Sequence, residues 1–189
     1  MIFLLFGITL FVAIHLLPTF SRQRKLLIDR LGHLPYLALF SAISLIAFLL
    51  IIYGYSQSDH TPLWQPLAFG RSLALAVMPF VFILIAAAYL KTYMRAKLRH
   101  PMLIGTALWA IAHLTATGDI ASVILFASFL FYAVADMIMA RPRQTLIPSG
   151  SPSVIHDLIA VTLGLMVYTS VLYGHEILFG VTIFNDKMI

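Results

Sequence analysis

The chain has 189 residues, of which 61% are hydrophobic and 10% are charged. Soluble proteins average roughly 45–50% apolar and about 25% charged residues, so a chain with a mean hydropathy of +0.99 has too few polar groups to cover a surface that faces water. The composition excludes a water-soluble monomer and predicts a polytopic membrane protein. No cysteine is present, which excludes disulfide scaffolds, thiolate nucleophiles, iron–sulfur clusters and cysteine-type zinc sites.

Six apolar stretches are candidates to cross the membrane, since a helix needs about 20 mostly apolar residues to span roughly 30 Å of hydrocarbon. They are residues 2–20, 34–55, 72–90, 101–118, 120–140 and 156–182. The fourth stretch is the shortest, because Gly118 and Asp119 interrupt it. Continuous apolar runs favour helices over barrel strands, in which apolar and polar residues alternate. We expect an all-α bundle of about six transmembrane helices that forms a single domain over residues 1–189.

The basic residues are distributed unevenly between the loops. Of the 12 lysines and arginines, all but Arg71 and Lys187 lie in the loops 21–33, 91–100 and 141–155. The positive-inside rule places these three loops in the cytoplasm, which predicts that both termini lie outside, in the periplasm, and that the chain is a multi-pass protein of a bacterial inner membrane. The net charge of +5 is therefore a topology signal, and we expect membrane lipids and no nucleic acid as partners. A site for anionic lipids is the other interpretation of these loops.

Several histidines lie at membrane depth, where ionisable side chains are costly and are therefore candidates for function. His15 lies about two-thirds of the way along the first stretch, His113 lies in the outer part of the fourth, and His175 lies in the outer part of the sixth. For any one of them, a neutral imidazole hydrogen-bonded to another helix is the simplest interpretation. Two histidines on different helices are also the arrangement that axial haem ligation requires. Zinc is the weaker alternative, because the chain has no HExxH or comparable pair of ligands.

Other polar residues near the helix ends have simpler interpretations. Asp136 and Asp157 are expected to be helix-end or loop-pairing groups, and Asp119 is expected to be the N-cap of the fifth stretch. Arg71 lies at the outer end of the third stretch, where it could bind a carboxylate such as a haem propionate or extend to lipid headgroups. The aromatic residues near the helix ends are expected to form interfacial belts; they include Tyr53, Tyr55, Trp64 and Tyr89.

Helix geometry separates His100 from His113. The two residues are 13 positions apart, which on one continuous helix turns their side chains by about 220° relative to each other. They can bind the same iron only if the helix begins after His100. Trp109 shares the face of His113 with several small residues, and such a stripe lets a neighbouring helix or a flat macrocycle approach closely. Plain helix packing is the alternative interpretation of that stripe.

Three motifs resemble the NnrU family of small bacterial membrane proteins. They are AIHLLP at residues 13–18, LRHPMLIGTALWAIAHLTATGD at residues 98–119, and the tail HDLIAVTLGLMVY…HEILFGV. The resemblance covers essentially the whole chain, and the run from Arg99 to Asp119 is its most specific part. It implies an association with denitrification, through nitrite and nitric oxide metabolism. The same domain forms the core of 15-cis-zeta-carotene isomerase, a membrane enzyme that holds haem b.

The resemblance to that isomerase implies iron ligands at His15 and His113, and it also implicates His100, whereas His175 matches the NnrU tail only. We therefore expect a haem b-binding membrane protein, isomerase-like or redox-active toward an apolar substrate that enters from the lipid. Trp109 and Arg71 complete the expected cofactor-binding set. By depth in the membrane, His15 with His100 or His113 with His175 would match better, because His15 lies about 10 Å nearer the cytoplasm than His113.

Two further functions compete with this expectation. The first is a non-catalytic accessory protein that supports denitrification. The second rests on Arg99-His100-Pro101, with Gly105 after it, which also resembles the cofactor-binding start of membrane methyltransferases of the isoprenylcysteine carboxyl type. Those enzymes carry a glutamate motif downstream, but the only glutamate here is Glu176, at the other membrane face. The methyltransferase is therefore the weakest alternative, and Pro101 has the structural interpretation of starting a helix.

Overall fold

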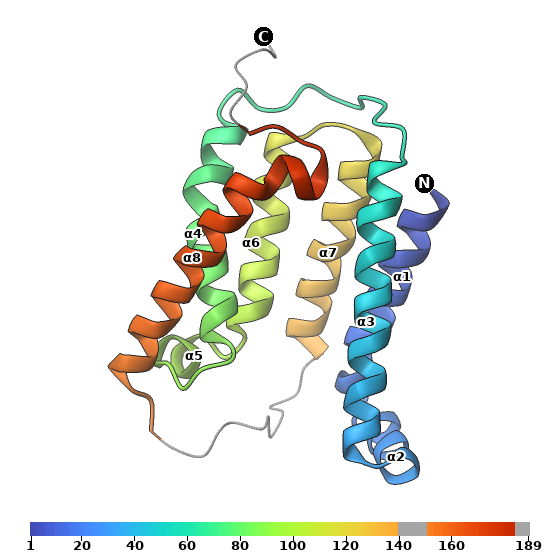
Figure 1. Cartoon of the computed structure of the whole chain (residues 1–189), viewed down its shortest axis with the longest axis vertical. Coiled ribbons are helices and arrows are strands. Elements are labelled where there is room, and N and C mark those ends of the chain that lie inside the picture. Colours follow the sequence, from blue (N-terminus) through green and yellow to red (C-terminus); the bar gives the residue numbers. More distant parts are fainter. Residues whose placement is uncertain (140–150, 184–189) are drawn as a thin grey trace. The chain divides into compact units, whose positions relative to one another are not determined.

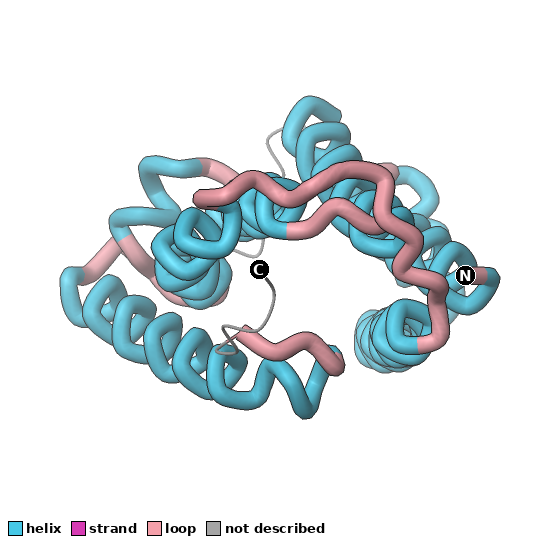
Figure 2. Tube along the Cα trace, turned by 90° about the horizontal axis from the view of Figure 1, so that it is seen from above, coloured by secondary structure: helices cyan, strands magenta, loops and turns pink. Residues whose placement is uncertain are grey.

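The computed structural model describes residues 1–139 and 151–183, and within them it consists of helices and loops without a strand (Figures 1 and 2). A single bridge joins the backbone of Pro62 to that of Asp119. Among these described residues, five segments are long and apolar enough to cross a membrane: α1 (Ile2–Leu16) with the 3₁₀ turn η1 (Leu17–Thr19), α3 (His33–Ser56), α4 (Gly70–Ala87), α7 (Ile120–Met139) and α8 (Val154–Phe179). The predicted helical membrane bundle is confirmed.

The sixth predicted span is the apolar helix α6 (Pro101–Ala116), and it is shorter than the other five. Its 16 residues extend about 24 Å at the usual rise per residue, less than the roughly 30 Å of the hydrocarbon core. The sequence predicted this helix to be the shortest. The side of the membrane on which the termini lie, and which membrane it is, stay predictions.

Two short helices occupy segments that the sequence analysis treated as loops. They are α2 (Ser21–Leu31), between η1 and α3, and α5 (Tyr93–Leu98), between α4 and α6. Asp157 holds the start of α5, because its carboxylate accepts the backbone N–H groups of Tyr93 at 3.1 Å and Met94 at 3.4 Å. This confirms the predicted loop-pairing role of Asp157. In the third expected loop, Arg141 and Arg143 lie outside the described residues, as does Lys187 near the C-terminus.

The chain forms two compact units that are interleaved in the sequence. Unit 1 contains α1, η1, α2, α3 and α7, and it draws on residues 1–64 and 119–143. Unit 2 contains α4, α5, α6 and α8, and it draws on residues 65–118 and 144–189. The expected single domain over residues 1–189 stays a prediction.

Close helix packing holds each unit together. In unit 1, α1 lies against α3, and a Cβ atom at Gly54 would overlap the backbone of Leu4, which is fully buried. In unit 2, α4 packs against both α6 and α8, and a Cβ atom at Gly164 would lie 2.6 Å from the Cα of Ile83. Only glycine permits such close approach, which is typical of helices that associate inside membranes.

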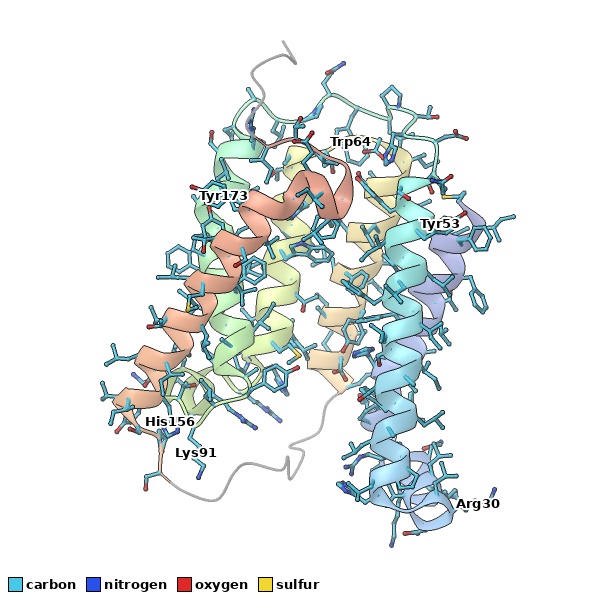
Figure 3. The ribbon with its side chains drawn as sticks, viewed as in Figure 1. Arg30, Tyr53, Trp64, Lys91, His156 and Tyr173 are labelled. Atoms are coloured by element: carbon cyan, nitrogen blue, oxygen red, sulfur yellow. The ribbon has the colours of Figure 1, made fainter. Side chains whose placement is uncertain are left out.

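Basic residues gather at one end of each unit. In unit 1, Figure 3 places Arg30 of α2 at one end, and Tyr53 and Trp64 at the opposite end. In unit 2, Lys91 lies beside the start of α8, where the backbone N–H of Ser153 donates to its carbonyl at 3.1 Å. Tyr53, Trp64 and Tyr89 are exposed, as expected of interfacial aromatic residues. The separation of basic and aromatic ends within unit 1 agrees with the charge pattern of the sequence.

Candidate functional site

His15 lies in the last turn of α1 and is held by its own helix. Its Nδ1 lies 2.8 Å from the carbonyl oxygen of Phe11, one turn earlier. Because a carbonyl oxygen can only accept, Nδ1 carries the proton and Nε2 of the neutral ring carries the lone pair. A hydrogen bond of this kind, from the nitrogen that does not bind metal to a backbone carbonyl, is what fixes the orientation of metal-binding histidines.

Aromatic side chains from three helices surround the His15 ring. Phe11 of α1 stacks on it with ring centroids 3.9 Å apart, and Phe40 of α3 and Tyr132 of α7 meet it edge-on at 5.3 Å and 6.2 Å. Asp136 of α7 is close enough to interact electrostatically with the imidazole. These rings shield His15 from water and hold its plane, and they do so with residues of unit 1 alone.

Asp136 is 2% exposed and joins α7 to the end of α1. The hydroxyl of Thr19, in η1, donates to its Oδ1 at 2.5 Å. The predicted role of Asp136 as a helix-end pairing group is confirmed, and this pairing holds η1 in place one turn beyond His15.

A groove with a volume of about 560 Å³ runs between α1 and α7 on the same unit. It is lined by Ile8, Thr9, Val12, Ala13, Ala127, Ser128 and Phe131. The two helices run parallel, because Phe11 meets Phe129 and His15 meets Tyr132 further along both. The groove therefore lies about one turn before the His15 ring, in the middle of two membrane-spanning helices.

His113 in α6 is held in the same way as His15. Its Nδ1 lies 2.9 Å from the carbonyl oxygen of Trp109, one turn earlier, so Nε2 carries the lone pair of the neutral ring. The indole of Trp109 lies beside the imidazole, with ring centroids 5.5 Å apart. The sequence prediction that Trp109 and His113 share a face of one helix is therefore confirmed.

His175, near the end of α8, lies close to His113. Its Nδ1 lies 2.9 Å from the carbonyl oxygen of Val181, and its ring centroid lies 5.0 Å from that of Phe179. The imidazoles of His113 and His175 are near enough to interact electrostatically. Of the histidine pairs that the sequence offered, this one lies within electrostatic range inside unit 2. The pairing of His15 with His113 or His100 stays a prediction, because His15 belongs to the other unit.

His100 directly precedes α6, whose first residue is Pro101. The helix begins after His100, so the angular argument against a common iron for His100 and His113 does not apply. The backbone turns sharply at Arg99, which has φ 47° and ψ −45°, and the N–H of His100 donates to the carbonyl of Leu98 across it. This is a classic γ-turn, which is rare and strained for a residue with a side chain. Strain of this kind is found at functional sites.

Arg71, the predicted carboxylate anchor, lies in the first turn of α4 with an exposed side chain. Because α4 continues from there toward Lys91, Arg71 lies at the end of unit 2 opposite the basic residues of α5. This agrees with the predicted assignment of Arg71 to the less basic side. Its role toward a cofactor stays a prediction.

A polar cluster around Asp119 was only partly foreseen. The Ser122 backbone N–H donates to the Asp119 carboxylate at 3.0 Å, which confirms the predicted N-cap of α7. The Ser122 hydroxyl donates to the same carboxylate at 2.5 Å, and His60 Nδ1 lies 2.8 Å from it. The hydroxyl of Tyr55 lies 2.8 Å from that of Ser122. Tyr55, predicted as an interfacial aromatic residue, is half-buried and belongs to this cluster instead. His60 and Tyr55 come from a loop and a helix that are distant in the sequence, and no pattern in the sequence indicated that they meet Asp119 and Ser122.

Burial and the neighbouring polar groups shift the pKa of Asp119 in opposite directions. Burial by itself raises the pKa of this carboxyl, but the hydrogen bonds from Ser122 and the hydrogen bond and charge of His60 outweigh it, so the pKa lies below its ordinary value of 3.8. The ionised carboxylate therefore ties the loop after α3 to the start of α7, at the end of unit 1 opposite α2.

The donor set decides which cofactors these side chains can hold. Over residues 1–139 and 151–183, no three histidine or carboxylate side chains come together as a protein-bound metal ion would require. Haem needs only one or two axial ligands from the protein, because the porphyrin supplies the other four. Neutral imidazoles with the lone pair on Nε2, set among aromatic rings, fit that requirement.

Comparison with known proteins adds one finding to this geometry. A family model described as NnrU protein matches residues 3–183. The chain matches no curated protein and no solved structure. The match covers nearly the whole chain, including both units and the histidines described above, and the chain therefore belongs to the NnrU family.

Proposed function

We propose that this NnrU protein binds haem b within the membrane, and that His15 and His113 are the residues that would hold its iron. The observation that carries the proposal is the shared geometry of the two imidazoles: each donates its Nδ1–H to the carbonyl four residues earlier and so presents the lone pair on Nε2. Metal-binding histidines are held by this kind of hydrogen bond. His175 also has a backbone carbonyl at its Nδ1, but that carbonyl belongs to Val181, six residues later; His175 is the alternative partner of His113.

The surroundings of the two histidines suit a flat, apolar cofactor. Phe11, Phe40 and Tyr132 bound the His15 ring, and Trp109 bounds the His113 ring. Aromatic side chains pack well against a macrocycle and keep water away from the ligand nitrogens. An apolar helical bundle supplies the low-dielectric environment in which haem proteins hold the porphyrin. Arg71 is the residue that would pair with a propionate.

The groove between α1 and α7 supports action on an apolar substrate. When bound, haem supplies an iron that can change its oxidation state and exchange an axial ligand. The side chains that line the groove are mostly apolar and lie at membrane depth, so a long hydrocarbon can lie along them and reach the neighbourhood of His15 from the lipid. This supports an isomerase-like or redox function more than one that needs a soluble substrate.

The geometry of unit 2 gives little support to the methyltransferase alternative. Asp157 at the start of α8 is bonded to α5, which leads directly to His100, whereas Glu176 lies 19 residues further along α8. At 1.5 Å per residue this is about 28 Å. The glutamate is therefore at the far end of the helix from the Arg99-His100-Pro101 motif, and the two cannot form one cofactor site.

Optical spectroscopy of the purified protein tests the proposal. Protein from haem-replete cells should show a Soret band and, after dithionite reduction, the sharp α and β bands of bis-histidine haem. His15→Ala and His113→Ala should each lower the haem-to-protein ratio at least about tenfold, because each removes an axial bond. His60→Ala is the matched control, since His60 lies outside the spans, and it should keep the wild-type spectrum. A colourless wild-type protein would refute the proposal.

The same preparation separates an enzyme from an accessory protein. Haem-loaded protein that converts an apolar cis-polyene, and loses that conversion in the His15→Ala variant, would support the isomerase-like function. Haem-loaded protein without conversion of any cis-polyene would favour the accessory role in denitrification.

A further inference from the structure

Helix α2 (Ser21–Leu31) is a charged helix inserted between two membrane spans. Its sequence, SRQRKLLIDRL, carries four basic residues and one acidic residue in eleven positions. The helix follows η1 at the end of the first span and stops at Gly32, whose φ of +86° permits the turn into α3. Both ends of α2 are therefore tied covalently to spans, and this fixes the helix at the membrane surface.

The basic side chains of α2 lack anionic partners in the described part of the chain. The one ion pair found over residues 1–139 and 151–183 is between His60 and Asp119, at the other end of unit 1. Arg22, Lys25 and Arg30 are exposed, and Figure 3 shows Arg30 at the end of unit 1, away from the spans. The basic end of unit 2 differs, because Asp157 from α8 lies against the start of α5.

Helix α2 is amphipathic, and this pattern favours a lipid surface as its partner. Arg22, Lys25 and Asp29 follow one another at helical spacing on one face, while Leu27, Ile28 and Leu31 lie on the opposite face. The half-buried Arg24 lies among these apolar residues, and Arg30 lies between the two faces. Leu27 and Ile28 are half-buried. Helices with an apolar face and a basic face lie in the membrane interface, with the basic side chains among the headgroups.

We propose that α2 binds the phosphate groups of anionic phospholipids through Arg22, Lys25 and Arg30. Unpaired cations held at headgroup depth meet lipid phosphates first, and a bilayer that contains anionic lipid attracts them more strongly than a zwitterionic one. The apolar face of α2 fits the boundary between headgroups and acyl chains, which an acidic soluble protein would not provide. The proposal is independent of haem binding.

The test compares the lipids that the full-length protein retains. Wild-type protein is reconstituted in nanodiscs of equal parts phosphatidylglycerol and phosphatidylcholine, released into mild detergent, and its bound lipids are counted by native mass spectrometry. We expect phosphatidylglycerol to be enriched about tenfold at low salt, and several-fold less at 1 M salt, where charges are screened over about 3 Å. The variant R22Q/K25Q/R30Q should lose most of this enrichment.

Two controls keep the result interpretable. The charge-conserving variant R22K/K25R/R30K should retain the enrichment, because the cations remain in place. The thermal midpoint of R22Q/K25Q/R30Q in pure phosphatidylcholine nanodiscs should equal that of the wild type. Equal retention of both lipids by the wild type would overturn the proposal, as would an enrichment that survives in the triple glutamine variant, since anionic lipid would then bind elsewhere. If the triple glutamine variant fails to fold, the single variants R22Q, K25Q and R30Q decide, because each should lower the enrichment.

Discussion

The two units each hold a histidine in the last turn of an apolar helix by the same local bond, but they surround it differently. His15 and His113 each donate Nδ1–H to the carbonyl four residues earlier. Around His15, unit 1 provides phenylalanine and tyrosine rings and one buried carboxylate. Around His113, unit 2 provides an indole and a second imidazole, that of His175.

This difference shows what each unit can contribute to a haem. Unit 1 offers one imidazole in an aromatic cage, so it can supply one axial ligand. Unit 2 offers His113 with His175 near it, so it has either one ligand with a neighbouring base or two ligands of its own. Iron binding by His15 with His113 and iron binding by His113 with His175 therefore predict different effects when each histidine is substituted.

The largest expected effect is the difference in bound haem between His15→Ala and His175→Ala. If one iron is held by His15 and His113, His15→Ala loses the sharp α and β bands and at least about tenfold in bound haem, because an axial iron–imidazole bond disappears. His175→Ala then keeps both. The measurement is the reduced absorption spectrum together with the haem-to-protein ratio. The reverse result, with bands lost in His175→Ala and kept in His15→Ala, would place the ligand pair inside unit 2.

The next largest effect is the loss of thermal stability when a close helix contact in either unit is overpacked. Gly54→Ala places a Cβ against the backbone of Leu4 in unit 1, and Gly164→Ala places one 2.6 Å from the Cα of Ile83 in unit 2. Overpacking costs about 1–3 kcal/mol, or more where backbone must move. Thermal unfolding in detergent should show a lower midpoint for both variants. If the units unfold separately, each variant should lower one transition only.

Gly174→Ala is the matched control for that comparison. Its Cβ would lie 3.5 Å from the Cδ1 of Leu178, which is an ordinary contact. Alanine also favours helix over glycine by roughly 0.5–1 kcal/mol. We expect this variant to be as stable as the wild type or slightly more so, and a loss equal to that of Gly164→Ala would contradict the packing argument.

Most of the fold follows from the sequence because the bilayer sets the length of each apolar run. The predicted stretches 34–55 and 120–140 differ by only one residue at either end from α3 (His33–Ser56) and α7 (Ile120–Met139). Counting apolar residues does not detect α2, because seven of its eleven residues are polar or charged. The signal for α2 was a helical period in the placement of Leu27, Ile28 and Leu31, which a search for apolar runs passes over.

The site was predictable only where its bonds are local. Four-residue spacing places a carbonyl below His15 and below His113 on any helix, and it also places Trp109 beside His113. The approach of His175 to His113, and the bonds from Thr19 to Asp136 and from His60 to Asp119, join residues far apart in the chain. They depend on how whole helices pack, and a single sequence carries no direct signal of that packing.

A smaller effect tests whether the Thr19–Asp136 bond positions the end of α1. Thr19→Val removes one donor from a buried carboxylate, and losing such a hydrogen bond costs about 1–3 kcal/mol. Thr9→Val is the control, because the Thr9 hydroxyl donates to Leu5 of its own helix and is exposed. Surface changes of that kind stay within about 0.5 kcal/mol. Unfolding in detergent should separate the two variants, and equal midpoints would show that η1 needs no anchor.

The smallest effect concerns the pH dependence of unit 1. Because the pKa of Asp119 is lower when the protein is folded than its ordinary 3.8, the folded state binds this proton more weakly than the unfolded state does. Asp119 therefore contributes stability above about pH 4, and that contribution is lost as the pH falls through the lowered value. Asp119→Asn keeps an N-cap, since asparagine caps helices as well as aspartate does, but it removes the charge. Below pH 4, the thermal unfolding midpoint of the wild type should decrease more steeply with falling pH than that of Asp119→Asn. His60→Ala should cost about 0.2–1 kcal/mol, as expected for an ion pair at the surface, and it should cost nothing further in the Asp119→Asn background. Parallel pH curves for the wild type and Asp119→Asn would mean that the ionised carboxylate does not tie the loop to α7.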